Sequence, residues 1–90
     1  MNVTVRFFRE VMTFIKEGEK RHLSQEIDEG SKTEDGKPTY LDYSVKLPPR
    51  SLNEFSRWVY RFMGSAQFRT PKELADKHKH EAEKLLARYF

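Results

Sequence analysis

Apolar residues follow helical spacing near both ends of the chain and alternate with polar residues in the middle. From residue 3 to residue 15 they recur every three or four positions, which is the spacing of one helix face, and Gly18 suits the end of such a helix. Up to Phe7 the same stretch also alternates, as a strand does. We therefore favour an N-terminal helix, and a strand over residues 2–8 remains the alternative.

The middle of the chain has the pattern of a β-hairpin. Residues 40–47 alternate strictly, with four apolar side chains on one face, and residues 23–28 alternate more weakly. Gly30 and the Asp35-Gly36 pair mark turns between these segments. The sequence predicts an antiparallel hairpin with a long acidic loop, whose tip at about residues 28–36 should be mobile.

Two further helices are predicted in the C-terminal half. Residues 51–54 and 70–73 both fit the capping box, a Ser or Thr followed three positions later by Glu. Pro71 suits a first helical position, and Gly64 suits the end of the earlier helix. The expected fold is α+β: an N-terminal helix, an antiparallel β-hairpin and two C-terminal helices in one small domain spanning residues 1–90. The residues expected in its core are Phe7, Val11, Phe14, Val45, Phe55, Val59, Phe62, Leu74, Leu85 and Leu86.

The composition sets limits on the type of protein. Ninety residues suffice for one core, and aromatic residues make up 13% of the chain, which compensates for an apolar fraction of only 37%. There is no cysteine, so disulfides, thiolate chemistry and cysteine-ligated zinc are excluded. No apolar stretch approaches the ~20 residues of a membrane span, and charged residues interrupt the only apolar run near the N-terminus. We expect a cytoplasmic protein that does not enter the membrane.

The charges are unevenly distributed, although the net charge is only +3. Residues 21–36 contain five acidic and two basic side chains, whereas residues 37–72 contain seven basic and two acidic ones. The chain therefore has an acidic segment followed by a basic segment that is also rich in aromatic residues.

No pattern indicates catalysis, a cofactor or a metal ion. His78 and His80 are two positions apart in a predicted helix, so they point about 200° from each other and cannot share one ion. The acidic loop does not match a calcium-binding loop. The sequence contains no phosphate-binding loop, dinucleotide fingerprint or nucleophile elbow. We therefore expect a protein that is not an enzyme.

The basic, aromatic segment is the best candidate for a partner-binding site. Arginine with tyrosine or tryptophan is typical of interface hot spots, and the same residues can also hold phosphates and stack on bases. The candidate residues, on one side of the first C-terminal helix with Trp58 at its boundary, are Arg50, Asn53, Arg57, Trp58, Tyr60 and Arg61. An ordinary solvated helix face with Trp58 in the core is the alternative. The first hypothesis is a small regulator or inhibitor, of a type that phages and mobile elements often encode, that binds a larger protein or nucleoprotein complex. The sequence leaves open whether it is a monomer or a homodimer.

DNA binding is the second hypothesis. Residues 40–90 read as a strand, a capped helix, Gly64 and another capped helix, an order that resembles the ribbon-helix-helix repressors. The resemblance implies that a strand from each of two protomers enters the major groove, with Ser44 and Lys46 facing the bases. The double proline after the strand and the long link after Gly64 depart from that family's pattern. Because acidic residues lie close to the basic segment, the charge distribution favours the protein partner.

Overall fold

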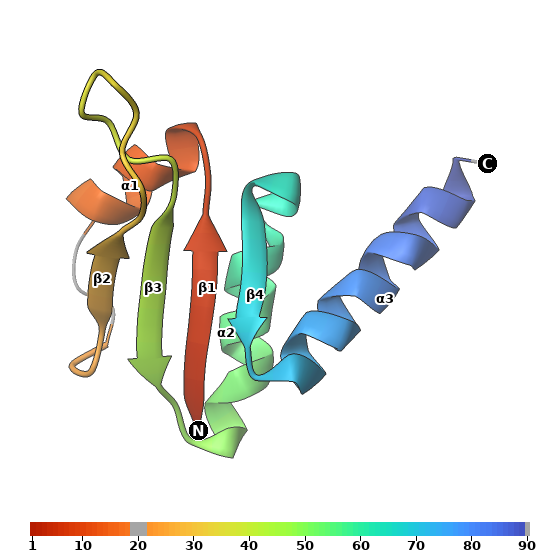
Figure 1. The fold of residues 1–90 in the computed structure, drawn as a ribbon. Coiled ribbons are helices and arrows are strands. Elements are labelled where there is room, and N and C mark those ends of the chain that lie inside the picture. The colour runs from red at the N-terminus through yellow and green to blue at the C-terminus, as the bar shows by residue number, and fades with distance from the viewer. Residues whose placement is uncertain (19–21, 90) are drawn as a thin grey trace.

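The computed structural model describes residues 1–18 and 22–89 (Figure 1). Its elements are β1 (Asn2–Phe7), α1 (Glu10–Glu17), β2 (Glu26–Glu29), β3 (Leu41–Lys46), α2 (Leu52–Tyr60), β4 (Ala66–Thr70) and α3 (Lys72–Arg88), with short 3₁₀ turns η1 (Pro49–Ser51) and η2 (Met63–Ser65) on either side of α2. The predicted α+β class is confirmed.

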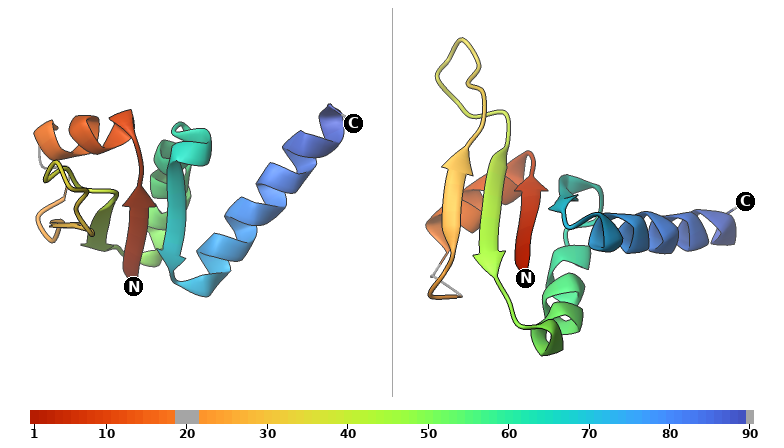
Figure 2. Two further views of the ribbon diagram at one scale, coloured as in Figure 1. Left: turned by 45° about the horizontal axis from the view of Figure 1, so that its top comes forward. Right: turned by 60° about the horizontal axis from the view of Figure 1, so that its bottom comes forward.

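The four strands form one sheet in the order β2-β3-β1-β4, and every neighbouring pair is antiparallel. With one helix after β1 and another after β3, this is the βαββαβ arrangement of ferredoxin-like folds. Side chains of α1 and α2 pack on the same face of the sheet, and α3 is an addition that leaves the sheet beyond β4 (Figures 1 and 2). The opposite face of the sheet, called the open face below, carries polar side chains of the central strands, among them Thr4, Arg6, Asp42 and Ser44.

The N-terminal segment is the strand that was the alternative prediction, and only Glu10–Glu17 forms a helix. Val3, Val5 and Phe7 are fully buried, while Thr4 and Arg6 between them face the open side. β1 is a central strand that pairs with β3 and β4, so its backbone groups are bonded on both edges. Pairing on two sides, together with the β-branched valines, outweighs the helical spacing.

A fourth strand occupies residues 66–70, where the sequence suggested only a link between two helices. Ala66 and Phe68 point into the core, and the pairing with β1 skips Arg69, which forms a bulge. The hydrogen bonds of the two predicted capping boxes are also absent. η1 leads directly into α2, Pro71 precedes α3, and neither helix has a side-chain cap at its start.

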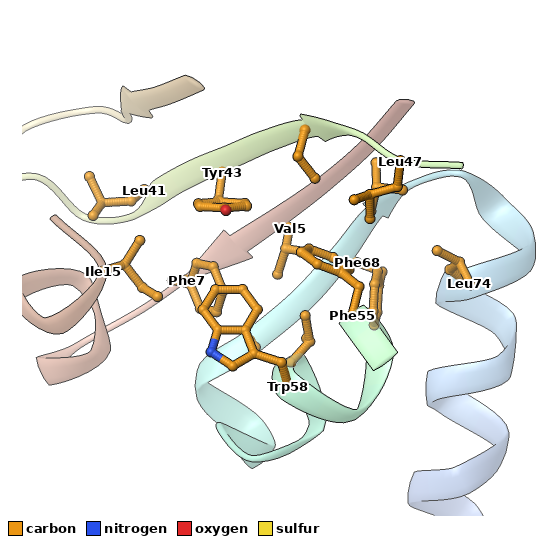
Figure 3. Packing of buried hydrophobic residues seen from close by; sticks show 14 residues of the cluster. Val5, Phe7, Ile15, Leu41, Tyr43, Leu47, Phe55, Trp58, Phe68 and Leu74 are labelled. Atoms are coloured by element: carbon orange, nitrogen blue, oxygen red, sulfur yellow. The ribbon is translucent and has the colours of Figure 1, made fainter. Parts of the chain in front are cut away.

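The core lies between the inner face of the sheet and α1 and α2 (Figure 3). Five residues predicted for it are buried there: Phe7, Val45, Phe55, Val59 and Leu74. Val11 and Phe62 are partly buried against it. The prediction was wrong for three residues that remain 62%, 45% and 57% exposed: Phe14, Leu85 and Leu86. Phe14 is displaced because Ile15 is the residue that α1 buries, and the two leucines lie on the part of α3 that has left the body of the protein.

The predicted hairpin is present, with Ile27 of β2 opposite Tyr43 of β3. The loop between the strands begins where the Gly30 amide donates to the Tyr40 carbonyl at 2.8 Å. A tighter turn at its tip is closed by Gly36, whose φ of 78° suits glycine. Lys16 of α1 contacts Glu29 of β2, and this contact lowers the pKa of the Glu29 carboxyl group.

Candidate functional site

Three exposed cations, defined here as the basic row, lie in the η1 turn, in α2 and directly after α2: Arg50, Arg57 and Arg61. Asn53, Arg57 and Arg61 follow one another at intervals of four positions, so they share one side of the helix. Asn53 is also exposed, and its Oδ1 accepts a hydrogen bond from Lys77 Nζ at 3.4 Å. Within the described residues no carboxylate forms an ion pair with any of the three arginines. Four of the six predicted partner-binding residues therefore lie together on the surface.

The two aromatic residues of the predicted site lie elsewhere. Trp58 is only 8% exposed, with its ring centroid 5.8 Å from that of Phe7 and 5.5 Å from that of Phe62. Tyr60 is half-buried and its ring stacks on His78 of α3. Trp58 thus belongs to the core, as the alternative interpretation had it, because α2 also packs on Phe7 in the central strand. The basic row is a purely polar surface.

The ribbon-helix-helix arrangement is not the one this chain adopts. β3 pairs with β1 on one edge and with β2 on the other, so it has no free edge for a strand from a second protomer. Ser44 lies on the open face, where its hydroxyl is 3.0 Å from that of Thr4. The Lys46 side chain is exposed at the end of the strand. Ser44 and Lys46 are thus parts of a four-stranded sheet and not of an intermolecular ribbon.

The main feature of the open face of the sheet is an ion pair between Arg6 and Asp42. Arg6 donates from Nε to Asp42 Oδ1 at 2.8 Å and from Nη2 to Asp42 Oδ2 at 3.1 Å. Its guanidinium carbon lies 3.7 Å from the centre of the Tyr40 ring. Asp28 stands directly opposite Asp42 in the sheet. On this face Arg6 is already paired, and Asp28 adds a further carboxylate. The face is therefore poorly suited to bind nucleic acid, which needs unpaired cations and exposed rings.

The Arg6–Asp42 pair should make a measurable contribution to stability. Each side chain is about one quarter exposed and the pair is bidentate, so we expect a coupling energy of about 1 kcal/mol. Urea unfolding of Arg6→Ala, Asp42→Ala and the double variant gives this value as a double-mutant cycle. A coupling energy indistinguishable from zero would show that the pair is only a surface contact.

A groove that the sequence did not predict lies between α3 on one side and β4 with the end of α2 on the other. Its volume is about 550 Å³, and most of its lining is apolar. β4 contributes Ala66 and Phe68, α2 and η2 contribute Tyr60 and Met63, and α3 contributes Leu85 among others. The groove was missed because its floor is β4, whose five residues include only two buried apolar side chains.

Tyr60 and His78 form the polar part of the groove. Their ring centroids are 4.9 Å apart with the planes 15° from parallel, and Phe68 meets the His78 ring edge-on at 5.4 Å. The Tyr60 hydroxyl is buried and has no hydrogen-bond partner within the described residues. Burial raises the pKa of Tyr60, with the Glu81 carboxylate adding to the effect, and burial lowers the pKa of His78.

The lowered pKa of His78 predicts that the protein loses stability in mild acid. The unfolded chain takes up a proton near the ordinary histidine pKa of ~6.5, while the folded chain resists protonation until the pH is lower. The free energy of unfolding should therefore fall as the pH drops from about 7.5 to about 5.5. Urea titrations at several pH values test this. His78→Gln should reduce the slope, and a slope that this variant leaves unchanged would contradict the prediction.

Within residues 1–18 and 22–89, no three histidine or carboxylate side chains are grouped so as to hold a metal ion. No helix in the same ranges is both long enough and apolar enough to cross a bilayer.

The fold and these surfaces define a small α+β domain of ferredoxin-like topology, with a polar open face, an exposed basic row and one appended helix. Comparison with known families assigns it further: residues 1–86 match the WCX domain, and the chain belongs to that family. Neither the curated proteins nor the solved structures contain a match to it.

Proposed function

We propose that this WCX domain is a non-enzymatic binding module that recognises an acidic surface of a larger protein or nucleoprotein complex through the basic row. In this role it regulates or inhibits that partner, and it does so in the cytoplasm. One observation carries the proposal: Arg50 of η1, Arg57 of α2 and Arg61 at the end of α2 are exposed and form no ion pair within the described residues.

Unpaired surface arginines favour a partner for a physical reason. A guanidinium group presents a planar fork of donors that matches a carboxylate or a phosphate, and a row of them gives directional recognition. Arg6 and Lys16 are examples of cations that the fold has paired with carboxylates. The basic row is thus a surface whose charges the fold itself does not use.

Charge reversal in the basic row tests the proposal. Arg57→Glu combined with Arg61→Glu should weaken binding of the partner about tenfold or more, equal to about 1.4 kcal/mol. Because both side chains are exposed, stability should change by only ~0.5 kcal/mol for each substitution. The partner is first captured from a host extract, then purified and titrated against each variant.

A matched control separates the surface from the net charge. Lys37→Glu combined with Lys46→Glu makes the same charge change on exposed residues of the hairpin, away from α2. This variant should bind the protein partner as the wild type does. Equal affinities for all three proteins would mean that the basic row is an ordinary solvated helix face.

The alternative, a DNA-binding regulator, makes a different prediction for the same variants. Binding to phosphates should weaken steeply and log-linearly with salt, and it should depend on Lys46, the candidate base contact on β3. Binding to a protein should depend less on salt and should not require Lys46. Fluorescence anisotropy with labelled duplex DNA at two salt concentrations therefore distinguishes the two.

A further inference from the structure

One side of α2 is turned toward α1 and His22, next to the outer side that carries Arg57 and Arg61. The ring centroid of Phe62 lies 5.8 Å from that of Phe14 in α1, and the ring centroid of Phe55 lies 6.2 Å from that of His22. Trp58 points to the same side of the helix, toward Phe7 (Figure 3). This side of α2, together with Phe14 and His22, is called the aromatic flank below.

A small pocket lies at the start of the aromatic flank. Its volume is about 70 Å³, which is several times the space that one water molecule needs. The residues that line it are His22, Ser51, Glu54, Phe55 and Trp58. Because three of these five residues contribute rings, the pocket suits one aliphatic side chain of a partner. Buried pockets of this kind hold the anchor residues of protein interfaces.

The other end of the aromatic flank exposes a phenylalanine. Phe14 is 62% exposed, and Phe62 is its only ring contact in the described part of the chain. Phe62 is itself half-buried, with its ring centroid 5.3 Å from that of Phe7 and 5.5 Å from that of Trp58. Rings therefore lead without interruption from the central strand to the surface, so Phe14 is an exposed apolar group supported by a rigid core.

The two contact points lie two helical turns apart. The pocket is centred near residue 55 and the second contact is at residue 62, so seven positions, about 10 Å, separate them along the helix axis. Residues seven positions apart share one face of a helix, so a partner helix lying along the flank reaches both points with two apolar side chains. An added strand would need a free sheet edge, whereas this flank is formed by α1, α2 and the segment that contains His22.

The charges beside the aromatic flank select an acidic partner. Arg57 and Arg61 are exposed, lie one turn apart and border the flank on its α2 side. Glu54 is the acidic residue of α2, and within the described residues it pairs with neither of them. Two guanidinium groups one turn apart match two carboxylates four positions apart on a neighbouring helix. On the α1 side the border carries Glu10, one turn before Phe14, so the partner's carboxylates belong over α2.

We propose that the partner binds the domain with an acidic amphipathic helix that packs along the aromatic flank, an inference that rests on the proposed function. One apolar side chain of this helix enters the pocket, and a second, seven positions away, covers Phe14. Two carboxylates, four positions apart, pair with Arg57 and Arg61. The basic row thus supplies the charge of the site, and the aromatic flank supplies its apolar contacts.

Nucleic acid fits the aromatic flank less well. Phosphates could pair with the arginines, but bases stack on exposed ring faces. Phe55 and Trp58 are only 4% and 8% exposed, so their rings line a pocket and do not form a platform for stacking.

Photocrosslinking from position 14 identifies the segment that lies on the flank. The full chain, with p-benzoylphenylalanine in place of Phe14, is irradiated in a host extract, and the crosslinked peptides are sequenced by mass spectrometry. They should come from another protein and carry apolar residues seven positions apart and acidic residues four positions apart. The same photoprobe in place of Lys37, an exposed residue of the hairpin loop, should not capture them. A peptide from a second copy of this chain, a peptide without this pattern, or no crosslink above the Lys37 control would overturn the proposal.

Titration with a synthetic peptide of the captured sequence tests the two contact points. Phe14→Ala removes one of them and Ser51→Leu fills the pocket at the other, so each should weaken binding about tenfold, equal to about 1.4 kcal/mol. Met63→Ala is the matched control for Phe14→Ala, because Met63 is similarly exposed, at 60%, but lies beside the groove next to α3. It should bind as the wild type does. Circular dichroism should show that the peptide gains helix on binding; a bound peptide without helix, or unchanged affinity for both variants, would contradict the proposal.

A charge exchange tests the orientation of the helix and separates this proposal from the proposed function. Lysines in place of the two matched acidic residues of the peptide should prevent binding to the wild type, and Arg57→Glu with Arg61→Glu should restore it. If this arginine reversal weakens binding of the whole partner but Phe14→Ala and Ser51→Leu do not, the helix proposal is overturned and the basic-row proposal stands. If the arginine reversal has no effect on the partner, both are overturned.

Discussion

Phe7→Ala should lower the free energy of unfolding by ~3–5 kcal/mol. Phe7 is fully buried in the central strand, and its ring meets those of Tyr43, Trp58 and Phe62 at centroid distances of 6.3, 5.8 and 5.3 Å. Alanine would leave a cavity between the sheet and α2 that these three rings cannot close without moving. A chain of 90 residues has a total stability of roughly 5–13 kcal/mol, so this one substitution should remove a large share of it. Urea titration followed by circular dichroism measures the change.

Phe14→Ala is the matched control for this substitution. It removes the same side chain from a position that is 62% exposed and whose only ring contact among the described residues is with Phe62, at 5.8 Å. We expect a cost below about 1 kcal/mol. Equal losses for the two variants would mean that the packing shown for β1 is wrong.

Gly30→Ala should destabilise the protein by ~2–3 kcal/mol, although it adds only one methyl group at the start of a surface loop. A Cβ atom at Gly30 would lie 2.3 Å from the Tyr40 ring, closer than any real contact. The backbone cannot move away easily, because the Gly30 amide donates to the Tyr40 carbonyl. The ring cannot move away without leaving the Arg6 guanidinium, whose carbon lies 3.7 Å from the ring centre.

Gly64→Ala is the control for the steric argument. No atom lies within 4 Å of a Cβ at Gly64, and its φ is not in the left-handed region, so the substitution should be nearly neutral. Thermal unfolding of the two variants should therefore give clearly different midpoints. If Gly30→Ala unfolds at the wild-type temperature, Tyr40 does not cover Gly30 in solution.

The parts of the fold that the sequence predicted are those determined by local pattern. Residues 41–46 alternate strictly, and the inner face they define is the one that is buried. The stripe of α2 at Phe55 and Val59 is buried as its spacing predicted. In these segments the spacing of the apolar residues fits one type of secondary structure far better than the other. The local sequence is therefore enough to predict the element.

Two strands could not be chosen from local pattern alone. Residues 3–15 fit a strand followed by a helix as well as one helix, and the choice is made by pairing with β3 and β4, which are distant in sequence. β4 has two inward side chains, Ala66 and Phe68, too few for an alternating pattern to stand out. It becomes a strand because β1 offers it a free edge.

The candidate site was predictable to the same extent. The arginines were recognised as exposed because they lie opposite the apolar stripe, and the structure places them there. Trp58 was assigned to the boundary, yet it is three positions from Phe55, so a slightly wider stripe includes it in the core. The groove depends on β4 and on the direction in which α3 leaves it, and no segment of the sequence specifies both.

The bulge at Arg69 bears on how the protein behaves at high concentration. Exposed sheet edges are the usual starting point of fibrous aggregates, because a strand from another molecule can add to them. Here β4 is short and its ladder is interrupted where Arg69 is skipped. β2, at the other edge, is four residues long, and three of them are the carboxylates Glu26, Asp28 and Glu29. The β4 edge should therefore misalign an incoming strand, and the acidic β2 edge should repel the β2 edge of another molecule. We expect concentrated solutions of this protein to stay clear and free of amyloid.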